Sequence, residues 1–332
     1  MKYIIDGHYD ILMDVAARRK NGERQVIRRR YYPAFQKGGV TGIVASIFVD
    51  SQYLPYGALS VAMEQISALH CEIEETPDLL MLCTSADDFL RAAETGKIGF
   101  LLSFEGAEPV SSCLLLHGFY AAGVRGLGLA WSRRNAAADG CDFSGSLKKG
   151  GLTEFGRELV KEAEDLHMIL DLSHLSDEGV EDVLSITSCP VIASHSNSRA
   201  VAGSNRNLTD CQMREIASRG GTVGLNGCSL LTAGPGVSPD QNGLTAHLDH
   251  MTEIMGEDHV AFGFDFCDSF FADDLSSSTD QMPERPFDIL SGAHEDLPAF
   301  LDHLRQHGYT ESHLAKLAGE NWLHTFRHIL KH

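Results

Sequence analysis

The stretch Ile98-Gly99-Phe100-Leu101-Leu102-Ser103-Phe104-Glu105 is an apolar run that ends on a carboxylate. A short apolar run of this kind is typical of a strand buried on both faces, as in a parallel sheet. The same order, an apolar run followed by a metal-ligand residue type, recurs four more times in the sequence: 3–5 before His8 and Asp10, 168–172 before His174, 191–193 before His195, and 260–264 before Asp265. A parallel barrel gathers the carboxyl ends of its strands at one mouth, so we expect these side chains to converge.

Strand-like and helix-like segments alternate along the whole chain. The strand candidates number eight, at 3–6, 42–49, 98–104, 124–130, 168–173, 191–194, 222–225 and 260–265. Helix-favouring segments lie at 59–75, 86–94, 113–121, 154–165, 177–185, 210–218 and 244–255. Alternation implies a parallel sheet with right-handed crossovers, and eight units favour closure into a (β/α)8 TIM barrel. We therefore predict one catalytic domain over residues 1–332.

The remaining segments are assigned from turn and capping signals. Thr153 and Ser176 each precede a helical stretch and are predicted N-caps. Two irregular stretches, 135–151 and 269–290, follow the fourth and eighth strands and would lie at the barrel mouth, where they would shape a substrate pocket. The tail, 310–330, is expected to form two short helices that pack on the barrel.

Composition limits the class of protein. The chain has 332 residues and a formal net charge of −19, which argues against nucleic acid or an anionic membrane as partner because both require a basic face. No segment approaches the roughly 18 apolar residues of a membrane span. The eight cysteines form no Cys-x-x-Cys pair and are expected to be reduced. With no secretory segment at the start, we expect a soluble cytoplasmic protein; a homodimer is left open.

The residue types at the strand tips suit divalent cations. His8 and Asp10 are two residues apart, so in extended chain both point to one side. His174 and His195 end neighbouring strands, about 4.8 Å apart, and could share an ion. A bidentate carboxylate such as Glu105 could bridge two cations, although alone it could be a surface glutamate. The expected cofactor is two divalent metal ions, for which imidazole nitrogen and carboxylate oxygen are suitable ligands.

Two further residues have candidate roles in catalysis. Asp265 ends the last strand, beside His8 and Asp10 in a closed barrel, and suits a general base for an attacking water. The alternative is a helix N-cap. Arg206 follows the sixth strand and could hold a substrate carboxylate through its planar fork, or be an ordinary surface arginine.

Taken in order, these motifs resemble the membrane (renal) dipeptidase family of metallopeptidases, in its bacterial branch. The resemblance covers nearly the whole chain. It is carried by DGHYD at 6–10, SFEG at 103–106, GLTEFG at 151–156, DLSH at 171–174, SHSNSRA at 194–200, NRNL at 205–208, FDF at 264–266 and GEN at 319–321.

The resemblance implies a barrel with a binuclear zinc centre that hydrolyses dipeptides, often with a D-residue at the C-terminal position. By position, His8 and Asp10 would hold one zinc, and His174 and His195 the other. Glu105 would bridge them, Asp265 would handle the proton, and Arg206 would bind the terminal carboxylate of the dipeptide.

Three positions depart from the family pattern, all around the substrate. Trp131 stands where the vertebrate members have a substrate-contacting histidine, as in the bacterial branch. Asn226 is followed by Gly227 and Cys228 in place of two aromatic residues, and Cys267 replaces an aspartate. We therefore assign Trp131 and Asn226 to substrate binding and expect altered side-chain preference around an intact metal centre.

Two other functions remain as alternatives. A metal-dependent amidohydrolase could act on another small amide, an N-acyl amino acid or a lactone, because a barrel with metals does not choose its substrate. The opening motif of that class usually has two histidines separated by one residue, whereas here His8 is paired with Asp10 at the same spacing. The third reading, a catalytically silent metal-binding protein, is disfavoured because every candidate ligand is present.

Overall fold

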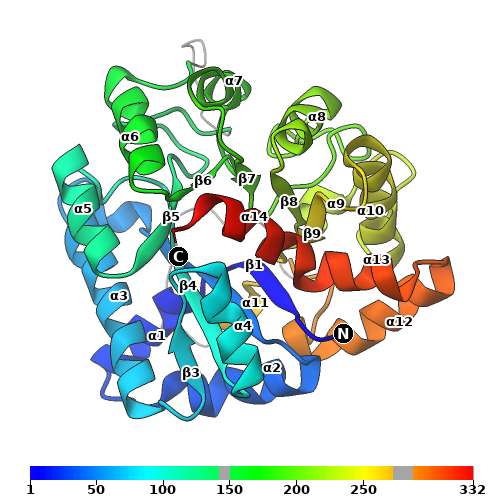
Figure 1. Cartoon of the computed structure of the whole chain (residues 1–332), viewed down its shortest axis with the longest axis horizontal. Helices are drawn as coiled ribbons and strands as arrows, with labels where there is room; N and C mark the ends of the chain where they lie inside the picture. The colour runs from blue at the N-terminus through cyan, green and yellow to red at the C-terminus, as the bar shows by residue number, and fades with distance from the viewer. Residues whose placement is uncertain (142–149, 272–286, 332) are drawn as a thin grey trace.

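The computed structural model describes residues 1–141, 150–271 and 287–331, and its centre is a barrel of parallel strands (Figure 1). The sheet path runs β1-β2-β4-β5-β6-β7-β8-β9, with each strand parallel to the next. The strands on this path are β1 (Ile5–Tyr9), β2 (Gly42–Phe48), β4 (Ile98–Glu105), β5 (Val124–Gly128), β6 (Ile169–Asp171), β7 (Ile192–Ala193), β8 (Thr222–Leu225) and β9 (Val260–Phe262). The predicted TIM barrel is confirmed.

The barrel closes where its first and last strands meet. The backbone N–H of Asp265 donates to the carbonyl of His8 at 3.3 Å. Beside it, Oδ1 of Asp6 accepts the N–H of Phe264 at 2.9 Å, and its Oδ2 lies 2.8 Å from Nε2 of His294. A fully buried carboxylate therefore completes the seam that brings His8 next to Asp265.

Most helices surround the strands as an outer layer, and each predicted helix is among the helices of the structure. They are α1 (Ile11–Lys20), α2 (Tyr32–Gly38), α3 (Ala58–Glu75), α4 (Ala86–Glu94), α5 (Cys113–Ala121), α6 (Glu154–Asp165), α7 (Asp177–Ile186), α8 (Asp210–Ser218), α9 (Ser229–Thr232), α10 (Gln241–Met255), α11 (Asp268–Phe271), α12 (Leu297–His307), α13 (Glu311–Ala315) and α14 (Asn321–Ile329). The predicted caps are confirmed, since Thr153 accepts the N–H of Gly156 and Ser176 that of Gly179.

Several elements differ from the sequence-based prediction. The helices α1, α2, α9, α11 and α12 were not predicted, nor was the short strand β3 (Leu80–Leu82), which pairs with the first half of β4. The strand β1 runs from Ile5 to Tyr9 rather than over 3–6, so His8 lies within a strand and Asp10 directly precedes α1. Strand pairing extends β1 this far because Tyr9 is in register with Ala45 of β2.

The C-terminal helix α14 covers the end of the barrel opposite the ligand-bearing strand ends (Figure 1). Trp322 is fully buried, and its indole N–H donates to the carbonyl of Phe262 at 2.8 Å. A Cβ on Gly7 would lie 2.4 Å from the Trp322 ring, so this glycine makes room for it. The indole therefore fills the barrel interior at this end, while the ligand-bearing strand ends lie at the opposite end.

Some expectations fall partly outside the described residues. Of the irregular stretches 135–151 and 269–290, residues 142–149 and 272–286 are not described. All eight cysteines lie in the described part, and each is a free thiol. In that same part, none of the helices is both long and apolar enough to cross a bilayer.

Candidate metal centre

At the carboxyl end of the barrel, the imidazoles of His174 and His195 both lie close to one carboxylate oxygen of Glu105. Nε2 of His174 lies 2.9 Å from Oε1 of Glu105, and Nε2 of His195 lies 3.5 Å from the same oxygen. The two imidazole nitrogens are 2.9 Å apart. Tetrahedral zinc with bonds of about 2.0–2.1 Å brings its ligand atoms to comparable separations. The three atoms can therefore share one ion.

The other oxygen of Glu105 faces a second group of ligands. Nε2 of His8 lies 3.5 Å from Oε2 of Glu105, 3.6 Å from Oδ1 of Asp10 and 3.8 Å from Oδ1 of Asp265. The hydroxyl of Ser46 donates to Oε2 at 3.1 Å and helps to hold the carboxylate. Glu105 thus divides its two oxygens between two ligand groups.

Two site residues have unusual backbone geometry. His174 has φ of 67° and Asp265 has φ of 59°, both in the left-handed region that residues other than glycine rarely occupy. Each lies three residues past the end of a short strand, β6 for His174 and β9 for Asp265. Strained conformations of this kind are often retained at functional sites.

The residues present fit divalent metal ions. Nε2 of His8 and Oδ1 of Asp10 are buried and make no hydrogen bond to the described part of the protein. Buried polar atoms without partners are costly, and a cation would satisfy both. Within the described residues, every group of three potential ligands belongs to this one cluster. Imidazole nitrogen and carboxylate oxygen are suitable donors for zinc and similar ions.

The surroundings favour the neutral ligand form of His174 and His195. Burial lowers the pKa of His174 and of His195 well below the usual value, and nearby positive groups, including Arg206, lower it further. For His8, burial lowers the pKa, but the carboxylates of Glu105 and Asp10 outweigh it and raise the pKa well above its usual value. Burial raises the pKa of Glu105 to about 8, and the charge of Asp10 adds to this effect. Carboxylates crowded into a buried space repel one another, and a cation between them would offset that repulsion.

Two serine hydroxyls contact the Nδ1 atoms of His174 and His195, on the ring side opposite the Nε2 atoms that face Glu105. Oγ of Ser132 lies 2.9 Å from Nδ1 of His174, and Oγ of Ser194 lies 2.7 Å from Nδ1 of His195. The hydroxyl of Ser194 in turn donates to Asp171 at 2.5 Å. Sequence analysis did not find these contacts, although Asp171 and Ser194 stand inside the DLSH and SHSNSRA motifs.

Arg206 reaches the centre, but its guanidinium is largely occupied by the protein. It is 7% exposed. Its Nη1 donates to Oγ of Ser196 and its Nη2 to the carbonyl of His195, both at 2.8 Å, while Nε lies 3.1 Å from Nδ1 of His174. Three of its five N–H groups are thus directed at described groups, which leaves two for another partner.

The residues predicted to bind substrate lie on different sides of the cluster. The Trp131 ring is 5.8 Å from that of His174 and packs edge-on against Phe48 at 5.4 Å. Asn226 is fully buried, and its side-chain amide donates to Oδ2 of Asp265 at 3.0 Å. Sequence analysis also missed Arg133, whose guanidinium lies 5.0 Å over the Trp131 ring.

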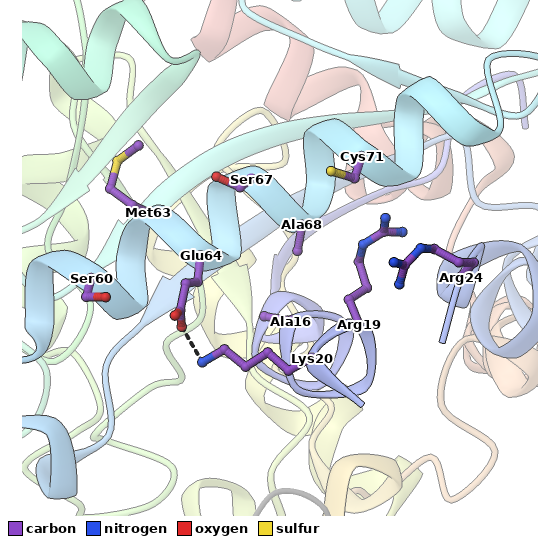
Figure 2. A pocket seen from close by; sticks show the side chains of 10 residues that line it. All are labelled: Ala16, Arg19, Lys20, Arg24, Ser60, Met63, Glu64, Ser67, Ala68 and Cys71. Atoms are coloured by element: carbon purple, nitrogen blue, oxygen red, sulfur yellow. Dashed lines mark ion pairs between the residues drawn. The ribbon is translucent and has the colours of Figure 1, made fainter. Parts of the chain in front are cut away.

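A separate cavity of about 500 Å³ lies on the outer layer between α1 and α3 (Figure 2). Its cations are matched by acids, because Lys20 pairs with Glu64 and Arg19 pairs with Glu75 at 2.6 Å. None of the predicted site residues lines this cavity. The cluster at the strand ends remains the candidate site.

A parallel barrel with imidazoles and carboxylates converging at its mouth is the arrangement of a metal-dependent hydrolase. The family model described as membrane dipeptidase, peptidase family M19, matches residues 2–331. The chain therefore belongs to the membrane dipeptidase family, as the motifs indicated, and is a metallo-dipeptidase that hydrolyses peptide bonds.

Solved structures and a curated relative agree with this assignment. The chain is similar to the metallopeptidase dipeptidase AC, with 30% identity and a TM-score of 0.84 over 99% of this chain and 98% of that one. A metallopeptidase from Rhodobacter sphaeroides, bound to a phosphinate mimic of L-Ala-D-Ala, has 29% identity and a TM-score of 0.83 over 98% and 99%. Dipeptidase verJ from Clonostachys rogersoniana is 31% identical over 66% of this chain and 55% of its own length.

Proposed function

We propose that this chain is a binuclear zinc dipeptidase, with residues 1–332 as one catalytic domain, that cleaves small dipeptides including L-Xaa-D-Xaa. The observation that carries the proposal is the divided carboxylate of Glu105, whose Oε1 faces His174 and His195 and whose Oε2 faces His8. One carboxylate between two ligand groups suits two ions rather than one. In this proposal His8 and Asp10 hold the first ion, His174 and His195 hold the second, and Glu105 bridges them.

Two such ions would polarise the peptide carbonyl and lower the pKa of the attacking water. The protein's own part is to move the proton and orient the substrate. Asp265 is 22% exposed and borders the cluster, so it can take the proton of the attacking water and pass it to the leaving amine. Its pKa is raised to about 6, mainly by burial, which is suited to both steps.

Substrate orientation is assigned to Arg206 and Trp131. The two remaining N–H groups of Arg206 could bind the carboxylate of the dipeptide, which would convert binding into orientation. Trp131 would pack against a substrate side chain. The binding of a phosphinate mimic of L-Ala-D-Ala by the Rhodobacter relative supports a substrate with a D-residue at its C-terminal position.

The test is hydrolysis of matched L-Xaa–L-Xaa and L-Xaa–D-Xaa dipeptides by purified protein before and after metal removal. We expect turnover that is lost with chelator, returns with zinc and reaches its maximum near two ions per chain. Hydrolysis of N-acyl amino acids or lactones in preference to every dipeptide would contradict the proposed substrate class.

A further inference from the structure

One buried hydroxyl, that of Ser194, lies against two imidazoles from different halves of the cluster. The rings of His8 and His195 are stacked with centroids 3.6 Å apart and an angle of 26°. Oγ of Ser194 is 2.7 Å from Nδ1 of His195 and 3.5 Å from Nδ1 of His8. The Nε2 atoms of both rings point away from Ser194 toward Glu105.

The direction of these hydrogen bonds is fixed by Asp171. Its Oδ2 lies 2.5 Å from Oγ of Ser194 and can only accept, so the hydroxyl proton points to Asp171. The lone pairs of the hydroxyl then face the two rings, and each Nδ1 must be the donor. Asp171 cannot turn away, because its Oδ1 accepts the backbone N–H of Ser173 at 3.0 Å and of Ser194 at 2.9 Å.

A proton on Nδ1 leaves the Nε2 lone pair of a neutral imidazole available to a metal. We propose that Asp171 and Ser194 are positioning residues that set the tautomer of His8 and His195 together, so that one hydroxyl supports the affinity of both metal ions. The inference rests on the binuclear site proposed above. The effect on His195 should be the larger one, since its contact with Ser194 is shorter by 0.8 Å (3.5 against 2.7 Å).

The structure offers two matched controls for Ser194. Among the described imidazoles, the hydroxyl of Ser132 contacts only that of His174, at an Nδ1 that also accepts the Nε–H of Arg206. Oγ of Ser173 accepts the backbone N–H of His195 at 3.2 Å and lies 3.4 Å from Oγ of Ser194. Ser173 is also buried, but its side chain has no hydrogen bond to an imidazole ring among the described residues.

The test is metal affinity, measured by chelator competition with Zn²⁺ and by the absorption of Co²⁺ in the same variants. Loss of an outer partner typically weakens metal binding by about 10–100-fold. We expect such a loss for the ion at His174 and His195 in Ser194→Ala, and a smaller loss for the ion at His8. Ser132→Ala should affect only the ion at His174 and His195, and Ser173→Ala should bind both ions as the unmodified protein does.

Asp171→Asn tests the direction of the hydrogen bonds. Its Oδ1 would still accept the two backbone N–H groups, so its NH₂ would face Ser194 and turn the hydroxyl proton toward the rings. The single hydroxyl proton would then be donated to Nδ1 of His195, the nearer ring, and His195 would carry its own proton on Nε2, as in the misoriented tautomer of a triad whose aspartate becomes asparagine. Long-range ¹H–¹⁵N spectra of the histidines distinguish the two tautomers, and melting temperature reports on the fold.

A loss confined to one ion in Ser194→Ala, or an equal loss in Ser173→Ala, would overturn the inference. So would unchanged histidine tautomers in Asp171→Asn. Fewer than two ions in the unmodified protein would remove its basis. If the unmodified protein binds two ions yet hydrolyses no dipeptide, the proposed function fails while the effect of Ser194 on affinity is still decided by the titrations.

Discussion

The side-chain amide of Asn226 donates a hydrogen bond of 3.0 Å to Oδ2 of Asp265. The amide has a defined orientation, because its Oδ1 accepts the backbone N–H of Cys228 at 2.7 Å. Asn226 was predicted to bind substrate, and in the structure its side chain has these two contacts within the protein. We therefore propose that Asn226 acts through Asp265, by holding one carboxylate oxygen and leaving the other to face His8.

Replacing Asp265 by asparagine should abolish most turnover while leaving the fold and both metals in place. The amide has nearly the same shape but cannot accept the proton of the attacking water. Groups of this kind contribute about 10²–10⁴-fold, so kcat should fall by that factor. Steady-state kinetics with metal content measured in parallel checks the prediction. A kcat near that of the unmodified enzyme would remove Asp265 from the proposed mechanism.

Replacing Glu105 by alanine should reduce metal content from two ions to one or none, because both ligand groups lose the carboxylate between them. Elemental analysis of purified protein measures this directly. Glu105→Gln is the matched control, since it keeps the size of the side chain but offers one weaker oxygen. Two ions retained in Glu105→Ala would contradict the bridging role.

The stability of the protein should depend on pH through His247, which lies on α10 and is fully buried. Its Nδ1 accepts the N–H of Ser198, and its Nε2 donates to the carbonyl of Thr232. Burial lowers its pKa from 6.5 to about 4, so the unfolded chain takes up a proton more readily between these values. Stability is therefore lost as the pH falls from about 6.5 toward 4.

A shift of this size corresponds to about 3 kcal/mol at most. Urea unfolding at a series of pH values should show a shallower fall in stability below pH 6.5 for His247→Gln than for the unmodified protein. His247 accepts a hydrogen bond from Ser198, which lies three residues after His195. The same measurement therefore reports on how much this hydrogen bond stabilises the segment that bears His195. Parallel curves for the two proteins would show that His247 does not contribute.

The convergence of the candidate ligands could be predicted from sequence, because each one stands at or just past the end of an apolar run and a parallel barrel gathers these ends at one mouth. Glu105 and His174 are far apart in the chain, yet Oε1 of Glu105 and Nε2 of His174 lie 2.9 Å apart in the barrel. The serine hydroxyls that contact the imidazoles could not be found in the same way. Ser194 and Asp171 are 23 residues apart, and a serine beside a histidine has no distinctive pattern until both strands are placed.

The elements missed in the fold have a comparable explanation. The strand β3 has only three residues and pairs with the lower half of β4, so its apolar run resembles an ordinary buried loop. In α1 the apolar residues Ile11, Leu12 and Met13 are consecutive, which hides the helical spacing. Such short or unpatterned segments are decided by tertiary contacts more than by local preference.

The last prediction concerns Arg206 and the free carboxylate of a dipeptide. A charge-assisted hydrogen bond contributes about 1.5–3 kcal/mol, so Arg206→Ala should raise KM for free dipeptides by about 10–100-fold. It should change KM for dipeptide amides much less, so the gap between acid and amide should narrow. Kinetics on matched acid and amide pairs measures this gap.

Because Arg206 also donates to Ser196 and to the carbonyl of His195, the alanine variant could disturb the metal ligands as well. Arg206→Lys is the appropriate control, since it keeps the charge but loses the planar fork. Metal content should stay near that of the unmodified enzyme in both variants if the effect is on substrate. If the unmodified enzyme hydrolyses dipeptide amides as well as free dipeptides, Arg206 does not bind the substrate carboxylate as proposed. An amidohydrolase acting on a wider range of amides would then be the better description of this site.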